Sequence, residues 1–461
     1  MVRRAGLSIS TVKASEIEFP TRIEAEYYQP YYLANKNTIL NCGLPVKRLK
    51  EIATKITDGS HITPEYQEDG VKFVMVRNLH EHNIDFEDVK YITPEMDKFL
   101  KQCKPARGDI LLSKVGSIGV SAVVPNDAPD FNIFVSLAVI KGVSPKLQTY
   151  VSTFLNSRFG RLQAERVAKG ISQPDLHLED IREFIIPIPS DKFADKISSI
   201  ILKAESLRKQ SEHLYADAEN LLASELGLDK LDLSESVFSI KNVSDVQNTK
   251  RIDAEHYKPK YQRLFEHLRK TGQAVKLADW VKEPLKRGVQ PEYVDDGDVK
   301  VINSQHVSKT QIELEDNRTT TKEFCQAGSN KRATIKQYDV LLNSTGYITI
   351  GRSQTLLEKI DAMVDGHVTI IRPKDDLDPV YLGVYLNSLP GLLQTERGWT
   401  GSSGQIELRI EIVENFLVWK PSMKIQLKIR QMIEQSYQAR QEAKRLLAEA
   451  KSAVEKMIEG I

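Results

Sequence analysis

The chain has 461 residues, a length that favours two to four domains. Its composition, 41% hydrophobic and 28% charged, is ordinary for a globular protein, and a net charge of +1 neither favours nor excludes a nucleic-acid partner. Cys42, Cys103 and Cys325 form no CxxC pair, which argues against a disulfide framework or a zinc site. Because the opening MVRRAGLSISTVKASE lacks the apolar run of a secretory signal, and no 18-residue apolar run occurs, we expect a cytoplasmic protein.

An internal repeat organises the chain. The phrase RIEAEYYQPYY at 22–32 returns as RIDAEHYKPKY at 251–261, so residue 22 corresponds to residue 251. Four further segments repeat in the same order at nearly the same offset: residues 71–84 with 299–312, 108–119 with 338–349, 154–157 with 385–388, and 172–189 with 404–421. One large unit is therefore duplicated with few insertions, whereas a solenoid would need three or more short units.

The first part of each repeat is predicted to be a globular domain of mixed α and β structure. Short β-rich runs such as VKFVMV, DILLSKV and VTIIRP are separated by Gly, Pro and Asp, which is typical of strands and turns. Two helix-like stretches, TYVSTFLNSRFGRLQAERVA and PVYLGVYLNSLPGLLQTE, interrupt the strands. We place the first domain, with a short N-terminal segment, at 1–190 and the second at 251–421, and expect an α+β fold.

A long helix is predicted after each domain, at 191–229 and 422–461, with a linker at 230–250. Apolar residues recur at alternating spacings of four and three over more than four heptads, which is typical of a coiled-coil seam. The predicted seam residues are Ile197, Ile200, Ala204, Leu207, Leu214, Ala218 and Leu221 in the first helix, and Ile429, Met432, Ala439, Ala443, Leu446, Ala450, Ala453 and Met457 in the second.

We expect the two helices to form an antiparallel coiled coil, which would relate the homologous domains by a pseudo-two-fold axis. The first helix carries a net negative and the second a net positive charge, which favours their pairing, although exposed ion pairs contribute little. A helix of this length spans roughly 54 Å, on the order of one to two turns of duplex DNA. The alternative is an ordinary amphipathic helix packed on its own domain.

Catalytic motifs are absent from the sequence. There is no Walker A sequence, no GxGxxG and no Asp/Asn-Pro-Pro-aromatic motif, so we expect no catalytic residues and no amino-methyltransferase site in this chain. His80 and His82 could suggest a metal pair, but no further ligand lies at helpful spacing, and a polar loop is the better interpretation. His61 next to Ser60 does not by itself make a nucleophilic dyad.

Glycine-containing polar turns recur at matching positions in both repeats and favour a contact surface. They are TDGSHITP, KVGSIG and KGISQP in the first repeat, and LKRGVQPEY, NSTGYITIGR and RGWTGSSGQ in the second. Glycine permits close backbone approach, cationic and hydroxyl side chains reach phosphates, and Gln, Asn and Arg read base edges. The candidate DNA-contact residues are Asp58, Gly59, Ser60, His61, Lys114, Ser117, Lys169, Ser172, Gln173, Lys286, Arg287, Gln290, Ser344, Thr345, Tyr347, Arg352, Trp399, Ser402 and Gln405. The alternative is a set of plain surface turns.

The motifs ITDGSHITP, GDILLSKVGSIG and GISQPDLHLEDIREFIIPIP resemble those of target recognition domains in specificity (S) subunits of Type I restriction-modification systems. The resemblance covers essentially the whole chain, as recognition domain, long helix, recognition domain and long helix. The second repeat departs from the pattern, because Lys286-Arg287-Gly288 stands where the first has Asp-Gly-Ser-His, and Ser-Gly-Gln at 403–405 replaces Ser-Gln-Pro. Residue-level correspondence in the second repeat is therefore weaker than its architecture.

The resemblance implies a non-catalytic subunit that binds double-stranded DNA, with each recognition domain reading one half of a bipartite site and the helices setting the spacer. Two methyltransferase (M) subunits would dock on the helices, and restriction (R) subunits would complete the assembly. No cofactor is then expected on this chain, since S-adenosylmethionine, ATP and Mg²⁺ would be bound by the partners. The alternatives are a self-sufficient DNA-modifying enzyme or nuclease with an unrecognised motif, and a coiled-coil scaffold without a DNA role.

Overall fold

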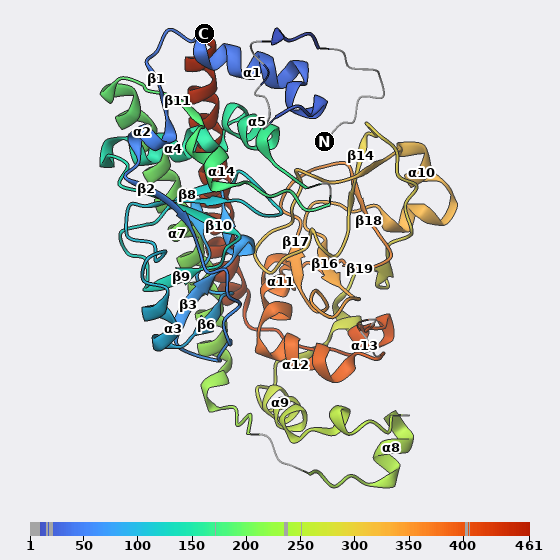
Figure 1. Cartoon of the computed structure of the whole chain (residues 1–461). Helices are drawn as coiled ribbons and strands as arrows, with labels where there is room; N and C mark the ends of the chain where they lie inside the picture. The colour runs from blue at the N-terminus through green and yellow to red at the C-terminus, as the bar shows by residue number, and fades with distance from the viewer. Residues whose placement is uncertain are drawn as a thin grey trace. The chain divides into compact units, whose positions relative to one another are not determined.

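The computed structural model of the chain describes residues 10–14, 17, 22–170, 172–234, 238–249, 251–401, 404 and 406–461. The chain divides into two compact units: unit 1 is Met1–Leu207 with Gln441–Ile461, and unit 2 is Arg208–Arg440. Each unit contains one globular domain and segments of both long helices (Figure 1). The fold mixes helices and sheets, which confirms the predicted α+β class. Within the described residues, no helix has the length and apolar character needed to cross a membrane.

The globular domain of unit 1 contains two small sheets. The larger has the order β2-β10-β7-β8 with antiparallel neighbours, and the smaller has the order β6-β3-β9 with a parallel β3–β9 pair. The strands are β1 (Val46–Arg48), β2 (Lys55–Asp58), β3 (Val71–Val74), β4 (Leu79–His80), β5 (Asn83–Ile84), β6 (Lys90–Ile92), β7 (Ile110–Ser113), β8 (Ser121–Val123), β9 (Phe131–Ile133), β10 (Leu137–Lys141) and β11 (Ile185–Pro187). The shorter helices are α1 (Pro30–Leu40), α2 (Leu49–Ile52), α3 (Pro94–Phe99), α4 (Pro145–Asn156), α5 (Arg158–Val167) and α6 (Leu178–Arg182).

Unit 2 repeats this topology. Its larger sheet has the order β13-β19-β16-β17, its smaller sheet has the order β15-β14-β18 with a parallel β14–β18 pair, and β12 pairs with β20 as β1 pairs with β11. The strands are β12 (Ala274–Lys276), β13 (Lys286–Arg287), β14 (Val299–Ile302), β15 (Thr319–Thr320), β16 (Val340–Asn343), β17 (Ser353–Thr355), β18 (Ala362–Val364), β19 (Val368–Ile371) and β20 (Leu417–Trp419). The shorter helices are α8 (Val243–Thr249), α9 (Pro259–Lys270), α10 (Lys322–Gln326), α11 (Pro379–Asn387), α12 (Leu389–Gly398) and α13 (Ile410–Glu414).

The central strand of each larger sheet is buried on both faces. In β7, Ile110 and Leu112 belong to one apolar cluster and Leu111 to another, and all three are 0% exposed. Successive side chains of a strand point to opposite faces, so the runs DILL and DVLL place apolar groups into two cores at once. This explains why these strands have continuous apolar sequences although their neighbours are antiparallel.

The phrase that opens each repeat forms a short turn followed by a helix. In the first repeat a 3-10 turn at Ala25–Tyr28 precedes α1, and the second copy forms one at Ala254–Tyr257 before α9. A proline occupies the first position of both helices, where its missing N–H costs nothing. The hydroxyl of Tyr28 donates to the Arg22 carbonyl oxygen at 2.9 Å, so the turn is closed from within.

The two long helices are α7 (Asp191–Leu226), with 36 residues, and α14 (Met423–Glu459), with 37. Neither sequence contains Gly or Pro, and a glycine with a left-handed φ follows each: Gly227 at 65° and Gly460 at 73°. A left-handed residue at that position satisfies the last helical carbonyls, and glycine adopts it without a Cβ penalty. Both helices therefore stop where the sequence supplies a glycine.

Burial along the long helices corrects half of the predicted seam. Ile197, Ala204 and Ala218 are buried as predicted, and Ser211 is buried between them. The intervening buried positions are shifted by one residue: Ile201, Tyr215 and Leu222 are buried where Ile200, Leu214 and Leu221 were predicted, and these three are half-buried, as is Leu207. In α14, Ile429, Ala439, Ala443, Leu446 and Ala450 are buried as predicted, but Ile433, Val454 and Ile458 replace Met432, Ala453 and Met457.

Helix segments of both repeats complete the apolar core of each unit. We define repeat 1 as residues 22–226 and repeat 2 as residues 251–459. In unit 1, Ile197 and Ile201 of repeat 1 share an apolar cluster with Ala450, Val454 and Ile458 of repeat 2. In unit 2, Ile429 and Ile433 share one with Ala218, Leu222 and Leu226. Within each unit the beginning of one long helix thus meets the end of the other, which is antiparallel pairing.

Candidate nucleic-acid interface

Three loops far apart in the sequence meet beside the larger sheet of unit 1. Backbone bridges join Val115, after β7, and Lys169, after α5, to Asp175. The Lys114 ammonium lies 3.2 Å from an Asp58 carboxylate oxygen at the end of β2 and 3.7 Å from one of Asp175. Lys114 is 6% exposed, so its charge is compensated by these two carboxylates and does not face solvent.

The turn after β2 is held close to the neighbouring chain. A Cβ on Gly59 would collide with the carbonyl oxygens of Ile133 and Phe134, so only glycine fits there. The hydroxyl of Ser60 is turned inward and donates to the Ile62 carbonyl oxygen at 2.6 Å. His61 has a side chain that is 70% exposed, and its Nε2 lies 3.2 Å from Asp58. His61 is therefore the side chain of this motif that is available to a ligand.

Unit 2 forms the same cluster with different charges. Backbone bridges join Thr345 and Thr400 to Glu407, as Val115 and Lys169 are joined to Asp175 in unit 1. Arg287, at the position of Asp58, forms an ion pair with Glu407 and donates a hydrogen bond to the Leu408 carbonyl oxygen at 2.7 Å. Ser344 occupies the position of Lys114; it is 0% exposed and its Oγ lies 2.5 Å from the hydroxyl of Thr369.

Gly288 shows that the two clusters are equivalent despite their different motifs. A Cβ on Gly288 would collide with the carbonyl oxygens of Val364 and Asp365, just as one on Gly59 would meet those of Ile133 and Phe134. Lys286-Arg287-Gly288 therefore replaces the residues that end in Gly59 at the same place in the fold. The apparent departure of the second repeat is a change of side chains on a conserved backbone arrangement.

The remaining candidate residues fall into three groups. Ser117, Lys169, Ser172, Gln173, Gln290 and Tyr347 are exposed, whereas Lys286, Thr345 and Arg352 are half-buried. Trp399 is half-buried and packs against the apolar core of unit 2, so its ring is part of that core rather than of an open surface. Ser402 and Gln405 lie outside the described residues.

Several polar residues of the clusters were missed by sequence reasoning. Asp175 and Glu407 join the loops in their respective units, and the repeat alignment of 172–189 with 404–421 already pairs them as acidic residues. His367 was also missed; its Nδ1 lies 2.7 Å from the Thr345 hydroxyl. Burial raises the pKa of Asp365, although the backbone N–H of His367 donates to its carboxylate and opposes that shift.

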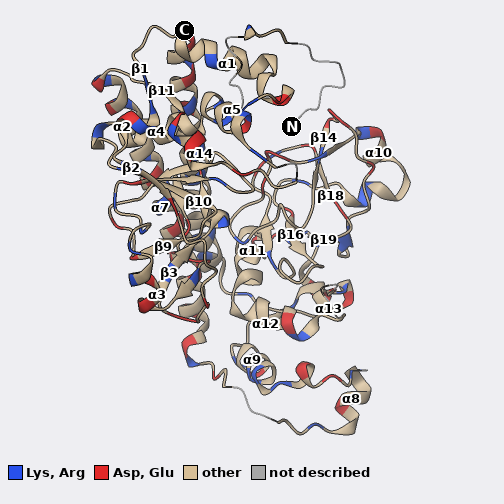
Figure 2. Ribbon diagram, in the orientation of Figure 1, with Lys and Arg blue, Asp and Glu red and all other residues tan. Residues whose placement is uncertain are grey.

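No metal centre or strongly basic surface is evident in these clusters. Among the residues that the structure describes, no group of three or more His, Cys, Asp and Glu side chains could hold a metal ion. His82 lies in the turn between β4 and β5, where burial lowers its pKa to about 4, whereas His80 is exposed. Lys and Arg are interspersed with Asp and Glu along the ribbon (Figure 2).

The fold and the paired clusters define a duplicated α+β protein with two equivalent loop sites that differ in side chains. In sequence the chain is similar to the protein named Type I restriction enzyme EcoBI specificity subunit from Escherichia coli, with 26% identity over 164 residues. The match covers 34% of this chain and 34% of that protein, so the chain spans about a third of the length of its curated relative. The resemblance to Type I specificity subunits inferred from the motifs is confirmed.

Solved structures give a similar result. The chain resembles the S subunit of a Type I restriction-modification system from M. genitalium, with a TM-score of 0.45, 12% identity, and coverage of 91% of this chain and 96% of that one. It also resembles the HsdS subunit from Thermoanaerobacter tengcongensis, with a TM-score of 0.28, 14% identity, and coverage of 91% and 97%. A third structure, described as concerning complex assembly and conformational transition of the type I R-M system, has a TM-score of 0.30, 14% identity, and coverage of 90% and 99%. No family model matches the chain.

Proposed function

We propose that this chain is the DNA sequence-specificity subunit of a Type I restriction-modification complex, and that each globular domain reads one half of a bipartite DNA site. The observation that carries the proposal is the pair of equivalent loop clusters with different chemistry. Unit 1 presents Asp58, Lys114 and Asp175 where unit 2 presents Arg287, Ser344 and Glu407. Two sites with one backbone and two sets of side chains suit a DNA site with two unlike halves.

The exposed residues at the edges of these clusters are the proposed DNA contacts. In unit 1 these are His61, Ser117, Lys169, Ser172 and Gln173, which can donate to phosphates or base edges. In unit 2 they are Gln290, Thr345 and Tyr347, and Tyr347 is 70% exposed. The buried residues Ser60, Lys114 and Ser344 would position the turns rather than contact DNA.

The long helices are the proposed docking site for two methyltransferase subunits. Leu202 of α7 and Leu427 of α14 are 63% and 48% exposed although they lie on helices whose other apolar residues are largely buried. Large apolar side chains in such positions are suited to cover by a partner. We propose that restriction subunits complete the complex, that S-adenosylmethionine, ATP and Mg²⁺ bind to these partners, and that this chain contributes no catalytic group.

The proposal is tested by reconstitution. The chain is purified alone and with the methyltransferase subunit encoded beside it, and each preparation is incubated with genomic DNA and S-adenosylmethionine before the modified bases are mapped by sequencing. We expect methylation at one bipartite sequence only when both proteins are present. Methylation or cleavage by the chain alone would support a self-sufficient enzyme, and a complex without any sequence preference would support a scaffold.

Exchange of one domain tests the assignment of half-sites. Residues 21–190 are replaced by the corresponding domain of another protein with the same motifs, and the methylated sequence is mapped again. We expect one half of the site to change and the other half and the spacer to be retained, because the second domain and the helices are untouched. A change in both halves together would contradict the assignment of one domain to one half-site.

A further inference from the structure

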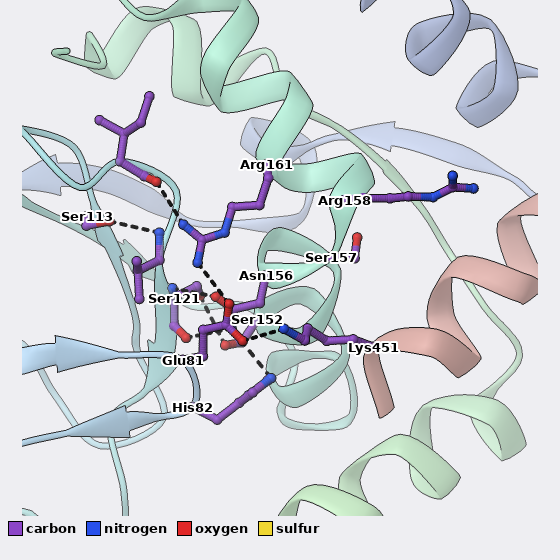
Figure 3. A network of polar contacts seen from close by, with 12 residues as sticks. Glu81, His82, Ser113, Ser121, Ser152, Asn156, Ser157, Arg158, Arg161 and Lys451 are labelled. Carbon is purple, nitrogen blue, oxygen red and sulfur yellow. Dashed lines mark hydrogen bonds and ion pairs between the residues drawn. The ribbon is translucent and has the colours of Figure 1, made fainter. Parts of the chain in front are cut away.

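A two-residue turn of unit 1 contacts the long helix of the other repeat. Glu81 lies in the turn between β4 and β5, and one carboxylate oxygen is 2.7 Å from the Lys451 ammonium on α14 while the other is 3.1 Å from the Arg161 guanidinium on α5 (Figure 3). The Glu81 and Lys451 side chains are 33% and 31% exposed. Burial alone would raise the pKa of Glu81, but Lys451 and Arg161 together hold it below its usual value.

Unit 2 contains a contact of the same kind. Lys309 lies in the turn between the bridged residues Val307 and Ile312, and its ammonium is 2.6 Å from a Glu219 carboxylate oxygen on α7. The Lys309 and Glu219 side chains are 47% and 28% exposed. The Lys309 backbone carbonyl accepts a hydrogen bond from the Tyr215 hydroxyl at 2.9 Å, which fixes this turn against the helix.

The two contacts occupy equivalent positions and have opposite polarity. The repeated segments 71–84 and 299–312 align Glu81 with Lys309. The starts of α7 at Asp191 and of α14 at Met423 align Glu219 with Lys451. In each unit the turn comes from one repeat and the helix from the other. We call these contacts latches: an acidic turn meets a basic helix in unit 1, and a basic turn meets an acidic helix in unit 2.

A second pair of equivalent positions differs in the same reciprocal way. In unit 2 the buried hydroxyls of Ser211 and Ser436 lie 2.9 Å apart, and Ser436 also donates to the Ser211 carbonyl oxygen at 2.7 Å. The equivalent residues in unit 1 are Ala204 and Ala443, which belong to one buried apolar cluster. One helix contact is therefore polar with polar, and its counterpart is apolar with apolar.

We propose that the latches and these helix contacts form a pairing code by which each repeat accepts the helix of the other repeat and rejects a copy of itself. If repeat 1 paired with a second copy of itself, Glu81 would face Glu219 and Ala204 would face Ser211. If repeat 2 did so, Lys309 would face Lys451 and Ser436 would face Ala443. Like charges and an unpaired buried hydroxyl both destabilise such pairs. The code keeps one copy of each unlike domain in every molecule, whatever the ligand of those domains is.

The code can be inverted in the full chain without a change of net charge. In the double variant Glu219→Lys/Lys451→Glu, both latches of the native pairing become like-charged, whereas pairs of like repeats from two chains become complementary. Relative to the unsubstituted chain, we expect a concentration-dependent increase in dimer by light scattering and an unfolding midpoint lower by roughly 4–8 °C. An unchanged mass together with an unchanged midpoint would overturn the proposal.

Two further variants separate the code from a general effect of charge. The quadruple variant Glu81→Lys/Glu219→Lys/Lys309→Glu/Lys451→Glu restores opposite charges in both latches with reversed polarity, and it should regain the mass and midpoint of the unsubstituted chain. A quadruple variant as perturbed as the double variant would contradict the code. The matched control Glu225→Lys/Lys456→Glu exchanges the same charges at exposed positions of the same helices and should behave as the unsubstituted chain.

Discussion

At the scale of single residues, the two units use opposite charges at one position of a shared fold. Asp58 and Arg287 end equivalent strands, and each is joined to the loop that contains Asp175 or Glu407, in unit 1 through Lys114 and in unit 2 directly. A partly buried charge is stable only with its partner, so the members of each cluster are expected to change together. Side chains can thus differ between units while the turns keep their positions.

Transfer of the unit 2 arrangement into unit 1 tests this coupling. Asp58→Arg alone places a guanidinium beside the buried Lys114 ammonium and should lower the free energy of unfolding by about 3 kcal/mol. Asp58→Arg/Lys114→Ser removes that repulsion and allows the new arginine to pair with Asp175, so most of the loss should be recovered. Urea unfolding of the two variants and of Lys114→Ser provides the double-mutant cycle, and strictly additive effects would show that the residues are not coupled.

His82 should make the stability of the chain depend on pH. Burial lowers its pKa to about 4 from an ordinary value of 6.5. Above the unfolded value the ring is neutral in both states, and as pH falls toward the folded value only the unfolded chain gains the proton. The free energy of unfolding should therefore fall by about 2 kcal/mol between pH 7 and pH 5 through this group alone.

His82→Asn isolates this contribution. Asparagine does not titrate, and it tolerates the positive φ of 57° at this position. Denaturant unfolding at several pH values should give a smaller pH dependence for this variant than for the unsubstituted chain. His213→Asn, at an exposed position of α7, is the control and should leave the pH dependence unchanged. Equal pH dependence in all three proteins would show that His82 is protonated in the folded state.

At the scale of elements, the long helices show how a one-residue choice of phase decides which side chains are buried. Ile200 and Ile201 are both apolar, as are Leu221 and Leu222, so the sequence alone supports two seams that differ by one residue. Packing against the globular domains selects Ile201 and Leu222, which are 8% and 0% exposed. A strict coiled-coil count does not include those domains, and this is why half of the predicted positions were displaced.

Neighbouring leucines provide a direct test of the phase. Leu222→Ala creates a cavity in the core of unit 2 and should lower the free energy of unfolding by about 2–5 kcal/mol. Leu221→Ala removes the same group from a half-buried position and should cost roughly half as much or less. Thermal or urea unfolding of the pair gives the comparison. Equal losses, or a larger loss for Leu221, would contradict the observed phase.

At the scale of the whole molecule, neither unit is a continuous stretch of chain. Unit 1 needs Gln441–Ile461, and unit 2 contains Arg208–Leu226 as well as the second domain. The antiparallel helices were expected from the sequence. Their division between the two units was not, because apolar periodicity shows that a helix is covered without showing which domain covers it. The loop clusters were only half predicted for the same reason: Gly59 and Lys114 stand in recognisable motifs, whereas Asp175 and Glu407 matter through contacts that only the fold creates.

Cleavage between the repeats should leave the molecule assembled. A specific protease site is inserted after Ile240, which is 88% exposed, and the folded protein is cut there. Because each unit contains chain from both sides of the cut, the two fragments should remain together at the mass of the intact chain in size-exclusion chromatography, and should separate in denaturant. Separation of the fragments under native conditions would contradict the division of the helices between units.

The composition of unit 1 also has a consequence for biosynthesis. Its apolar core includes Val454 and Ile458, and the ribosome makes these only after the whole of unit 2. At 5–20 residues per second, the first domain would wait roughly 10–50 s for the segment that covers its core. During that interval Ile197 and Ile201 lack their native neighbours, so the nascent first domain is a natural client for chaperones.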